Sequence, residues 1–351
     1  MFRLFSGFFG SDIGIDLGTV NVVVYVKGKG IVINEPSVIA VRRAQRGGRK
    51  EILAVGREAK AMVGKTPSGI ETVKPLREGV ISDFDMTEAM ISHFVRAADD
   101  RRGFFSRPRV VVSVPACVTE VERRAVVDAT LSAGAREAYV VEEPLAAALG
   151  ASLPIHEPRG NMVVDIGGGT CEVAVLSMGG IVVCKSIRGA GDEIDSAIVS
   201  MLRLNHKLAI GEGTAEQIKW ALGSVLPLEE ELQIEVKGRA LTDGLPSSIL
   251  LSSIQVREAI EPIIQRISET VKETLESTPP ELVRDIYEQG LVLAGGGALL
   301  RGLSQRLSKE LNVPVFVAEE PLLAVTNGLA RILENLDSKR PILNTVERGS
   351  F

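Results

Sequence analysis

The chain has 351 residues, of which 45% are hydrophobic and 24% charged, and it carries a formal net charge of −5 at pH 7. This length predicts two domains or one large two-lobed body, and the composition excludes a wholly disordered chain. The negative charge argues against a nucleic-acid partner, because a phosphate backbone requires a concentrated basic surface.

The first ten residues, MFRLFSGFFG, predict a segment that lies on a membrane surface. On a helical wheel the large apolar side chains share one arc, and Arg3 lies on the other with the small residues. Such a short segment would not stay helical in water, but an interface would bury each phenylalanine with a gain of roughly 1.5 to 3 kcal/mol before ordering costs. The alternative is a strand extension packed on the protein. The candidate membrane residues of this segment are Phe2, Leu4, Phe5, Phe8 and Phe9.

A hairpin pattern follows and occurs twice, at residues 14–33 and 163–183. Each time a strand carries an acid, a glycine turn with a threonine follows, and two further strands come after. Glycines let backbone N–H groups close on an anion, so two facing turns would hold a polyphosphate. Carboxylates repel phosphate unless a hard cation lies between them, so Asp16 and Asp165 are candidates to hold Mg²⁺ through its water shell. The alternative is that aspartate and glycine merely form tight turns.

Between the hairpins, residues 109–115 and 138–143 predict buried strands. The loop RRGFFSRPR before the first strand places Phe104 and Phe105 among arginines, which suits anionic lipid. A core-packed pair beside a solvated basic loop is the alternative.

The second of these strands ends at Glu143, directly before Pro144, a residue suited to the first helical position. Glu143 could orient or deprotonate the water that attacks a γ-phosphate, helped by the hydroxyl of Thr170. It could equally be a helix cap.

Two later motifs predict the nucleoside end of such a site. In IGEGTAEQIKWALG, Glu216 could accept hydrogen bonds from ribose hydroxyls while Lys219 lies near the base; the alternative is an ion pair between the two. In LVLAGGGALLRGL, a glycine turn follows a buried strand and is expected to open a helix at Ala298 or Leu299, where N–H groups favour phosphate or a flat base can approach. Such turns also occur for packing alone.

Several of these motifs, above all IGIDLGTVN, KPLREGVISDFDMTE, VEEPLAAALGASLP, DIGGGTCEVAVLS and LAGGGALLRGL, resemble those of the MreB/Mbl family of bacterial actins. That family belongs to the superfamily of actin, heat-shock chaperones and sugar kinases. The resemblance implies an α/β, duplicated ribonuclease H-like fold, with two lobes that each hold a mixed sheet, flanking helices and a small inserted subdomain. It also implies an ATP-dependent filament that assembles head to tail, maintains rod shape and organises cell-wall synthesis.

By position, the resemblance assigns Thr19 to Asn21 and Gly167 to Gly169 to two phosphate loops, and Glu143 with Thr170 to water activation. Val20, Val22 and Cys171 depart from the residues expected there. The predicted cofactor-binding residues are Asp16, Gly18, Thr19, Val20, Asn21, Asp165, Gly167, Gly168, Gly169, Thr170, Gly191, Asp192, Ala215, Glu216, Gln217, Ile218, Lys219, Gly295, Gly296, Gly297 and Ala298.

The domain organisation is predicted from the same resemblance and from residues 34–74 and 185–254, each of which looks like an insertion on its own half of a duplicated core. The expected subdomains are IA (1–33, 75–145 and 320–337), IB (34–74), IIA (146–184 and 255–319) and IIB (185–254), followed by a polar tail (338–351). A small-molecule kinase or a chaperone-type ATPase of the same superfamily is the alternative function.

The expected cellular setting is the cytoplasm, with the protein peripheral on the inner face of the cell membrane beside the cell-wall elongation machinery. No apolar run approaches the roughly 20 residues of a membrane span, and the N-terminus differs from a secretory signal. Three scattered cysteines suggest neither a zinc site nor a disulfide framework, which fits a reducing compartment.

Overall fold

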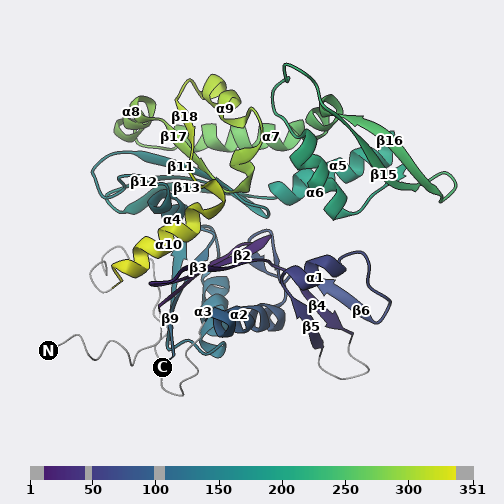
Figure 1. Cartoon of the computed structure of the whole chain (residues 1–351). Helices are drawn as coiled ribbons and strands as arrows, with labels where there is room; N and C mark the ends of the chain where they lie inside the picture. The colour runs from purple at the N-terminus through teal and green to yellow at the C-terminus, as the bar shows by residue number, and fades with distance from the viewer. Residues whose placement is uncertain (1–11, 44–49, 99–106, 337–351) are drawn as a thin grey trace.

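The computed structural model describes residues 12–43, 50–98 and 107–336, and it shows two lobes, one above the other in Figure 1. Both predicted membrane segments, residues 1–10 and the pair Phe104 and Phe105, lie outside the described residues, as does the predicted polar tail.

The first lobe is built on a five-stranded sheet in the order β10-β9-β1-β2-β3. Its three antiparallel strands, β1 (Ile13–Leu17), β2 (Asn21–Val26) and β3 (Gly30–Pro36), are the first predicted hairpin. The two remaining strands, β9 (Arg109–Val114) and β10 (Glu137–Glu142), run parallel to β1. The sheet is therefore mixed, as predicted.

The second lobe repeats this topology in the order β13-β12-β11-β17-β18. β11 (Asn161–Ile166), β12 (Thr170–Ser177) and β13 (Gly180–Arg188) form the second predicted hairpin. β17 (Leu291–Ala294) and β18 (Val315–Val317) extend the sheet in parallel beyond β11. The first strand of each hairpin is the central strand of its sheet. The glycine turns that follow these two strands therefore lie at equivalent places in the two lobes.

Helices cover both sheets, and two helices lie between the lobes. The first lobe carries α2 (Phe84–Ala98) and α3 (Glu120–Ser132), and the second carries α7 (Ser253–Glu276), α8 (Pro280–Gln289) and α9 (Leu303–Leu311). Between the lobes, α4 (Glu143–Gly150) packs on α10 (Ala324–Glu334). Their core joins Val111 and Val141 of the first sheet to Val163 and Leu176 of the second.

Each lobe also carries a smaller sheet (Figure 1). In the first lobe this sheet has the order β5-β4-β6, from β4 (Ile39–Arg42), β5 (Glu51–Val55) and β6 (Ile70–Val73), with α1 (Arg57–Met62) beside it. In the second it has the order β14-β15-β16, from β14 (Leu208–Ala209), β15 (Gln233–Ala240) and β16 (Pro246–Ser252), with α5 (Gly191–Asn205) and α6 (Glu212–Leu222). Strand β3 continues past the predicted limit between residues 33 and 34, and β13 continues past the predicted limit between residues 184 and 185. The subdomain limits stay predictions.

Three short elements complete the described chain. A two-stranded hairpin joins β7 (Leu76–Arg77) to β8 (Val80–Ile81), and η2 (Pro321–Leu323) precedes α10. The third element corrects a prediction, because no α-helix opens at Ala298 or Leu299. Residues Gly296–Leu299 form the 3-10 turn η1, and the α-helix α9 begins only at Leu303. Gly295 and Gly302 have φ of 76° and 83°, so the chain turns twice in the left-handed region before a helix can start.

Candidate functional site

A cavity of about 620 Å³ lies between the lobes, where the two glycine turns meet. Its size is that of a small-molecule site, and its wall combines backbone-rich turns, acids and apolar side chains. The predicted site residues that line it are Asp16, Gly18, Thr19, Val20, Asn21, Glu143, Asp165, Gly167, Gly168, Gly169, Thr170, Gly191, Asp192, Glu216, Lys219, Gly295, Gly296 and Gly297.

Four predicted residues do not line this cavity. Ala215, Ile218 and Ala298 are buried in the hydrophobic core of the second lobe, and Gln217 is exposed on α6. For the three residues on α6 the reason is helical geometry, since only residues three or four apart share a face. On α6 the cavity face consists of Glu216, Lys219 and Trp220, followed by Gly223 just beyond the helix.

The two glycine turns approach so closely that side chains on one require glycines on the other. A Cβ atom at Gly168 would lie 2.0 Å from Cγ2 of Val20, and one at Gly169 would lie 2.4 Å from Oγ1 of Thr19. The same Thr19 hydroxyl accepts a hydrogen bond of 3.1 Å from the N–H of Gly79. Val20, one of the departures noted in the sequence, therefore fills the contact between the turns.

Buried and half-buried acids gather beside these turns. The Asp16 carboxylate accepts hydrogen bonds from the hydroxyls of Ser113 (3.0 Å) and Thr326 (3.3 Å), but burial still raises its pKa to about 6. Burial, and then the charge of Asp16, raises the pKa of Asp165 to about 7. The two hairpin acids thus lie close enough to interact across one site, and neither is on a remote surface.

Glu143 belongs to the same group. It is the first residue of α4, whose cap is Glu142 and makes no side-chain capping bond, so the helix-cap alternative does not describe Glu143. Burial raises the pKa of Glu143 well above its usual value, and the carboxylates of Glu172, Asp16 and Asp165 add to this. Like charges in one region favour protonation of the carboxylates or the binding of a shared cation.

The donor set fits Mg²⁺ held through water. Carboxylate oxygens are the ligands this ion prefers, and it usually keeps several of its waters. Within the described ranges no three histidine, cysteine, aspartate or glutamate side chains are arranged to bind a metal directly. Asp16 and Asp165, which both line the cavity, could hold the ion by its hydration shell.

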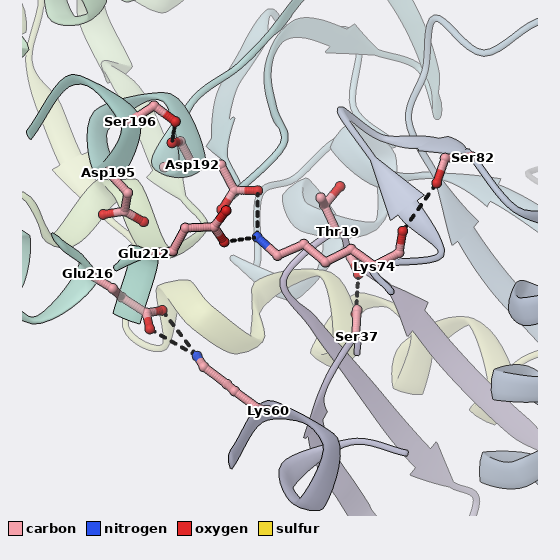
Figure 2. Close-up of polar contacts among 12 residues, drawn as sticks. Thr19, Ser37, Lys60, Lys74, Ser82, Asp192, Asp195, Ser196, Glu212 and Glu216 are labelled. Atoms are coloured by element: carbon pink, nitrogen blue, oxygen red, sulfur yellow. Dashed lines mark hydrogen bonds and ion pairs between the residues drawn. The ribbon is translucent and has the colours of Figure 1, made fainter. Parts of the chain in front are cut away.

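Ion pairs across the mouth of the cavity connect the lobes (Figure 2). The ammonium of Lys60 on α1 lies 3.0 and 3.3 Å from the two carboxylate oxygens of Glu216 on α6. Lys74 likewise reaches Glu212 at 3.2 Å and Asp192 at 4.0 Å. The predicted alternative, an ion pair between Glu216 and Lys219, is wrong.

Comparisons with known proteins agree with this geometry. The family model described as "MreB/Mbl protein" matches residues 10–341. The chain belongs to the MreB/Mbl family.

Its relatives in the MreB/Mbl family match along almost their whole length. The cell shape-determining protein MreB of Escherichia coli (strain K12) is 48% identical over 96% of this chain and 97% of its own. The cell shape-determining protein Mbl of Bacillus subtilis (strain 168) is 47% identical over 94% and 97%.

Solved structures give the fold. MreB5 of Spiroplasma citri bound to AMPPNP superposes with a TM-score of 0.88 at 35% identity, over 96% of this chain and 99% of that one. The MamK double helical filament, at 24% identity and a TM-score of 0.78 over 92% and 98%, shares the fold. The actin-like fold predicted from the sequence is confirmed.

Sequence reasoning missed two acids here, Asp195, which lines the cavity, and Glu172, which does not line it but whose charge acts on Glu143. Glu172 is 1% exposed and accepts a 2.9 Å hydrogen bond from the N–H of Ala116. Thr170 and Glu172 are two residues apart on one strand, so their side chains share a face, and this spacing could have revealed Glu172. Asp195 lines the cavity and binds the Lys219 ammonium at 2.9 Å. It lies one turn after Asp192 on α5, which is a weaker signal.

The described part of the chain contains no helix that is both long enough and apolar enough to cross a bilayer.

Proposed function

We propose that this chain is an ATP-dependent, filament-forming bacterial actin that binds Mg-ATP in the interlobe cavity and hydrolyses it. One observation carries the proposal: two matched glycine turns and a group of buried acids converge on a single cavity. MreB5 relatives bound to AMPPNP and ADP support a nucleotide as the ligand.

Each wall of the cavity has a proposed role. The N–H groups of residues 18–21 and 167–169 bind phosphate, and Asp16 and Asp165 hold the waters of Mg²⁺. Bound Mg²⁺ supplies positive charge beside the phosphate oxygens. Glu143 accepts the proton of the attacking water, because its side chain lines the same cavity as the glycine turns, and Thr170, which also lines it, orients that water.

Assembly and location follow from the same proposal. Head-to-tail contacts between different faces generate an open polymer, because no rotation closes them. The N-terminal segment and the arginine-flanked Phe104 and Phe105 attach the filament to the inner face of the membrane, and repetition along a filament strengthens weak anchors. The names of the E. coli and B. subtilis relatives support a role in cell shape, beside the cell-wall elongation machinery.

Sedimentation with anionic liposomes, with and without ATP, tests this function on the intact chain and on one lacking residues 1–10. We expect the intact chain to pellet with vesicles and to release phosphate in the same sample. The shortened chain should still release phosphate but pellet less with vesicles, and neutral vesicles serve as the control. ADP production that requires a small-molecule acceptor, with the phosphoryl group transferred to that acceptor and not released, would instead identify a kinase. Pelleting without hydrolysis would identify a scaffold.

A further inference from the structure

Two of the three cysteines meet where the lobes face each other. Cys117 belongs to the first lobe, in the loop between β9 and α3, and it is exposed. Cys184 belongs to β13 in the second lobe, where it is half-buried against the core between the lobes. The proposed nucleotide chemistry uses neither thiol.

Strand register and one hydrogen bond place the two cysteines near each other. Cys184 lies opposite Ala174 on β12, and the side chains of such cross-strand partners share a face. Glu172, two residues before Ala174, lies on that face too. The N–H of Ala116 donates a 2.9 Å hydrogen bond to the Glu172 carboxylate. The loop that carries Cys117 is therefore bonded to the face that carries Cys184.

The two side chains also interact directly. The thiol of Cys117 lies within hydrogen-bonding distance of the thiol of Cys184 and of the backbone of Ser186 on β13. Two cysteines can form a disulfide without backbone movement only when their side chains point toward each other. Cys117 and Cys184 meet this condition. Cys171 does not, because it lies on the opposite face of β12, in the core of the second lobe.

We propose that Cys117 and Cys184 are an oxidation site, at which a peroxide converts the two thiols to a disulfide that fastens the lobes together. The thiolate of the exposed Cys117 attacks one peroxide oxygen, the O–O bond breaks, and a sulfenic acid and water form. The sulfur of Cys184 then attacks the sulfenic sulfur, the S–O bond breaks, and a disulfide and a second water form. The two thiols together lose two electrons and two protons, which reduce hydrogen peroxide to water.

The surroundings of the pair make this reaction slow at neutral pH. Burial, and then the charge of Glu172, raises the pKa of both thiols, and the charge of Glu142 adds to this effect. The thiolate is the attacking form, so we expect the disulfide to form under sustained peroxide and to form faster as pH rises. A reducing compartment would return it to two thiols.

The position of the bond gives it a consequence for the cleft. Its two ends belong to different lobes, so it restrains any motion that separates them. This part of the inference rests on the proposed function, because the expected effect is slower release of a nucleotide from the oxidised chain. Unlike the ion pairs between the lobes, a covalent bond is not weakened by salt.

Peptide mapping tests whether the bond forms. The full chain is treated with hydrogen peroxide, its remaining thiols are blocked, and it is digested without reductant. We expect a linked pair of peptides that contains Cys117 and Cys184 and that separates in dithiothreitol. Cys117→Ser and Cys184→Ser should each abolish it, and thermal unfolding checks that both variants are folded. Oxidation in denaturant is the matched control and should also link Cys171, because an unfolded chain does not select one pair.

Release of a fluorescent ATP analogue tests whether the bond restrains the lobes. We expect release to be several-fold slower from the oxidised native chain than from the reduced chain, and dithiothreitol should restore the faster rate. Peroxide should leave the rate of Cys117→Ser unchanged. High salt should not remove the difference between the oxidised and reduced chains.

The outcomes distinguish this inference from the proposed function. If peroxide takes Cys117 only to a sulfinic acid, or links it only to another copy of the chain, the proposed pair is refuted. If the mapped disulfide forms but the release rate does not change, the restraint on the lobes is refuted. If the disulfide forms but neither the reduced nor the oxidised chain binds nucleotide, the proposed function fails while the oxidation site stands.

Discussion

Carboxyl groups that share one buried region have the largest consequences at the scale of single residues. Asp16, Asp165, Glu143 and Glu172 all have raised pKa values, and burial is the first cause for each. A protein keeps such a costly arrangement where its charge is used, so perturbed acids in a cavity indicate a functional site.

Glu143→Gln removes the proposed general base while keeping the size of the side chain. We expect ATP binding to persist and phosphate release to fall by roughly a hundredfold or more, the usual contribution of a general base. Calorimetry and a phosphate-release assay measure the two quantities. Glu142→Gln is the control, because the neighbouring Glu142 pairs with Arg123 at 3.4 Å. Equal turnover in the Glu143 variant and the native chain would contradict the assignment.

Glu172 makes the stability of the protein depend on pH. Burial and the charge of Asp165 raise its pKa from 4.5 to about 8. Between these values the folded chain keeps a proton that the unfolded chain has lost. The free energy of unfolding therefore falls as pH rises through this window, by at most about 1.4 kcal/mol per pH unit.

Glu172→Gln should abolish this part of the pH dependence, because an amide does not titrate. We expect the variant to melt at a higher temperature than the native chain at pH 8, with a smaller difference toward pH 5. Thermal unfolding without Mg²⁺ measures this, and the exposed Glu229→Gln provides the comparison. A difference in melting temperature that stays constant with pH would show that Glu172 does not titrate in this way.

At the scale of elements, the crossing of α4 and α10 forms a packed helix contact between the lobes. A Cβ atom at Gly150 would lie 1.7 Å from the carbonyl oxygen of Ala324, and one at Gly328 would lie 1.9 Å from that of Ala146. The two backbones therefore touch, which requires glycine on each helix at the crossing. This packing places Glu143, at the start of α4, beside the cavity.

Gly328→Ala should force these helices apart. We expect a loss of unfolding free energy of about 1 to 3 kcal/mol or more, the cost of overpacking. Gly213→Ala on α6 is a matched control of opposite sign, because nothing lies within 4 Å of the added methyl group and alanine favours the helix by up to about 1 kcal/mol. Denaturant unfolding of both variants measures the difference, and equal stabilities would refute the tight crossing.

At the scale of the whole molecule, the two lobes share one sheet topology and enclose a cleft, and ion pairs join the lobes across it. The ammonium groups of Lys60 and Lys74 belong to the first lobe, and their carboxylate partners belong to the second (Figure 2). These pairs are partly exposed, so each contributes no more than about 1 kcal/mol. That is enough to bias an opening motion without preventing it.

Lys60→Gln combined with Lys74→Gln should make nucleotide leave faster. We expect a several-fold increase in the dissociation rate of a fluorescent ATP analogue, because a more open cleft releases its ligand more readily. Added salt should narrow the difference from the native chain, since it screens exposed pairs. Arg57→Gln is the control, because Arg57 pairs at 3.3 Å with Glu35 inside the first lobe. Unchanged rates at low salt would exclude the pairs as a latch.

Much of this protein could be predicted from local sequence patterns. The duplicated hairpins, their glycine turns and the acids Asp16 and Asp165 were found because strand periodicity and turn chemistry depend on neighbouring residues. Glu143 was found for the same reason, since it ends a predicted buried strand directly before Pro144, although in the structure β10 ends at Glu142 and Glu143 begins α4. These features placed the site between two matching halves.

Other parts of the site were decided only by the tertiary structure. The pairing of Lys60 with Glu216 joins residues 156 positions apart, and no local pattern predicts it. The sequence predicted that Ala215, Gln217 and Ile218 line the cavity, but in the structure Trp220 does so instead. Packing against the second lobe sets the rotation of α6, and no local pattern gives that rotation. Local backbone chemistry thus determined the turns and acids by itself, whereas side-chain partners across the cleft depended on how the lobes pack.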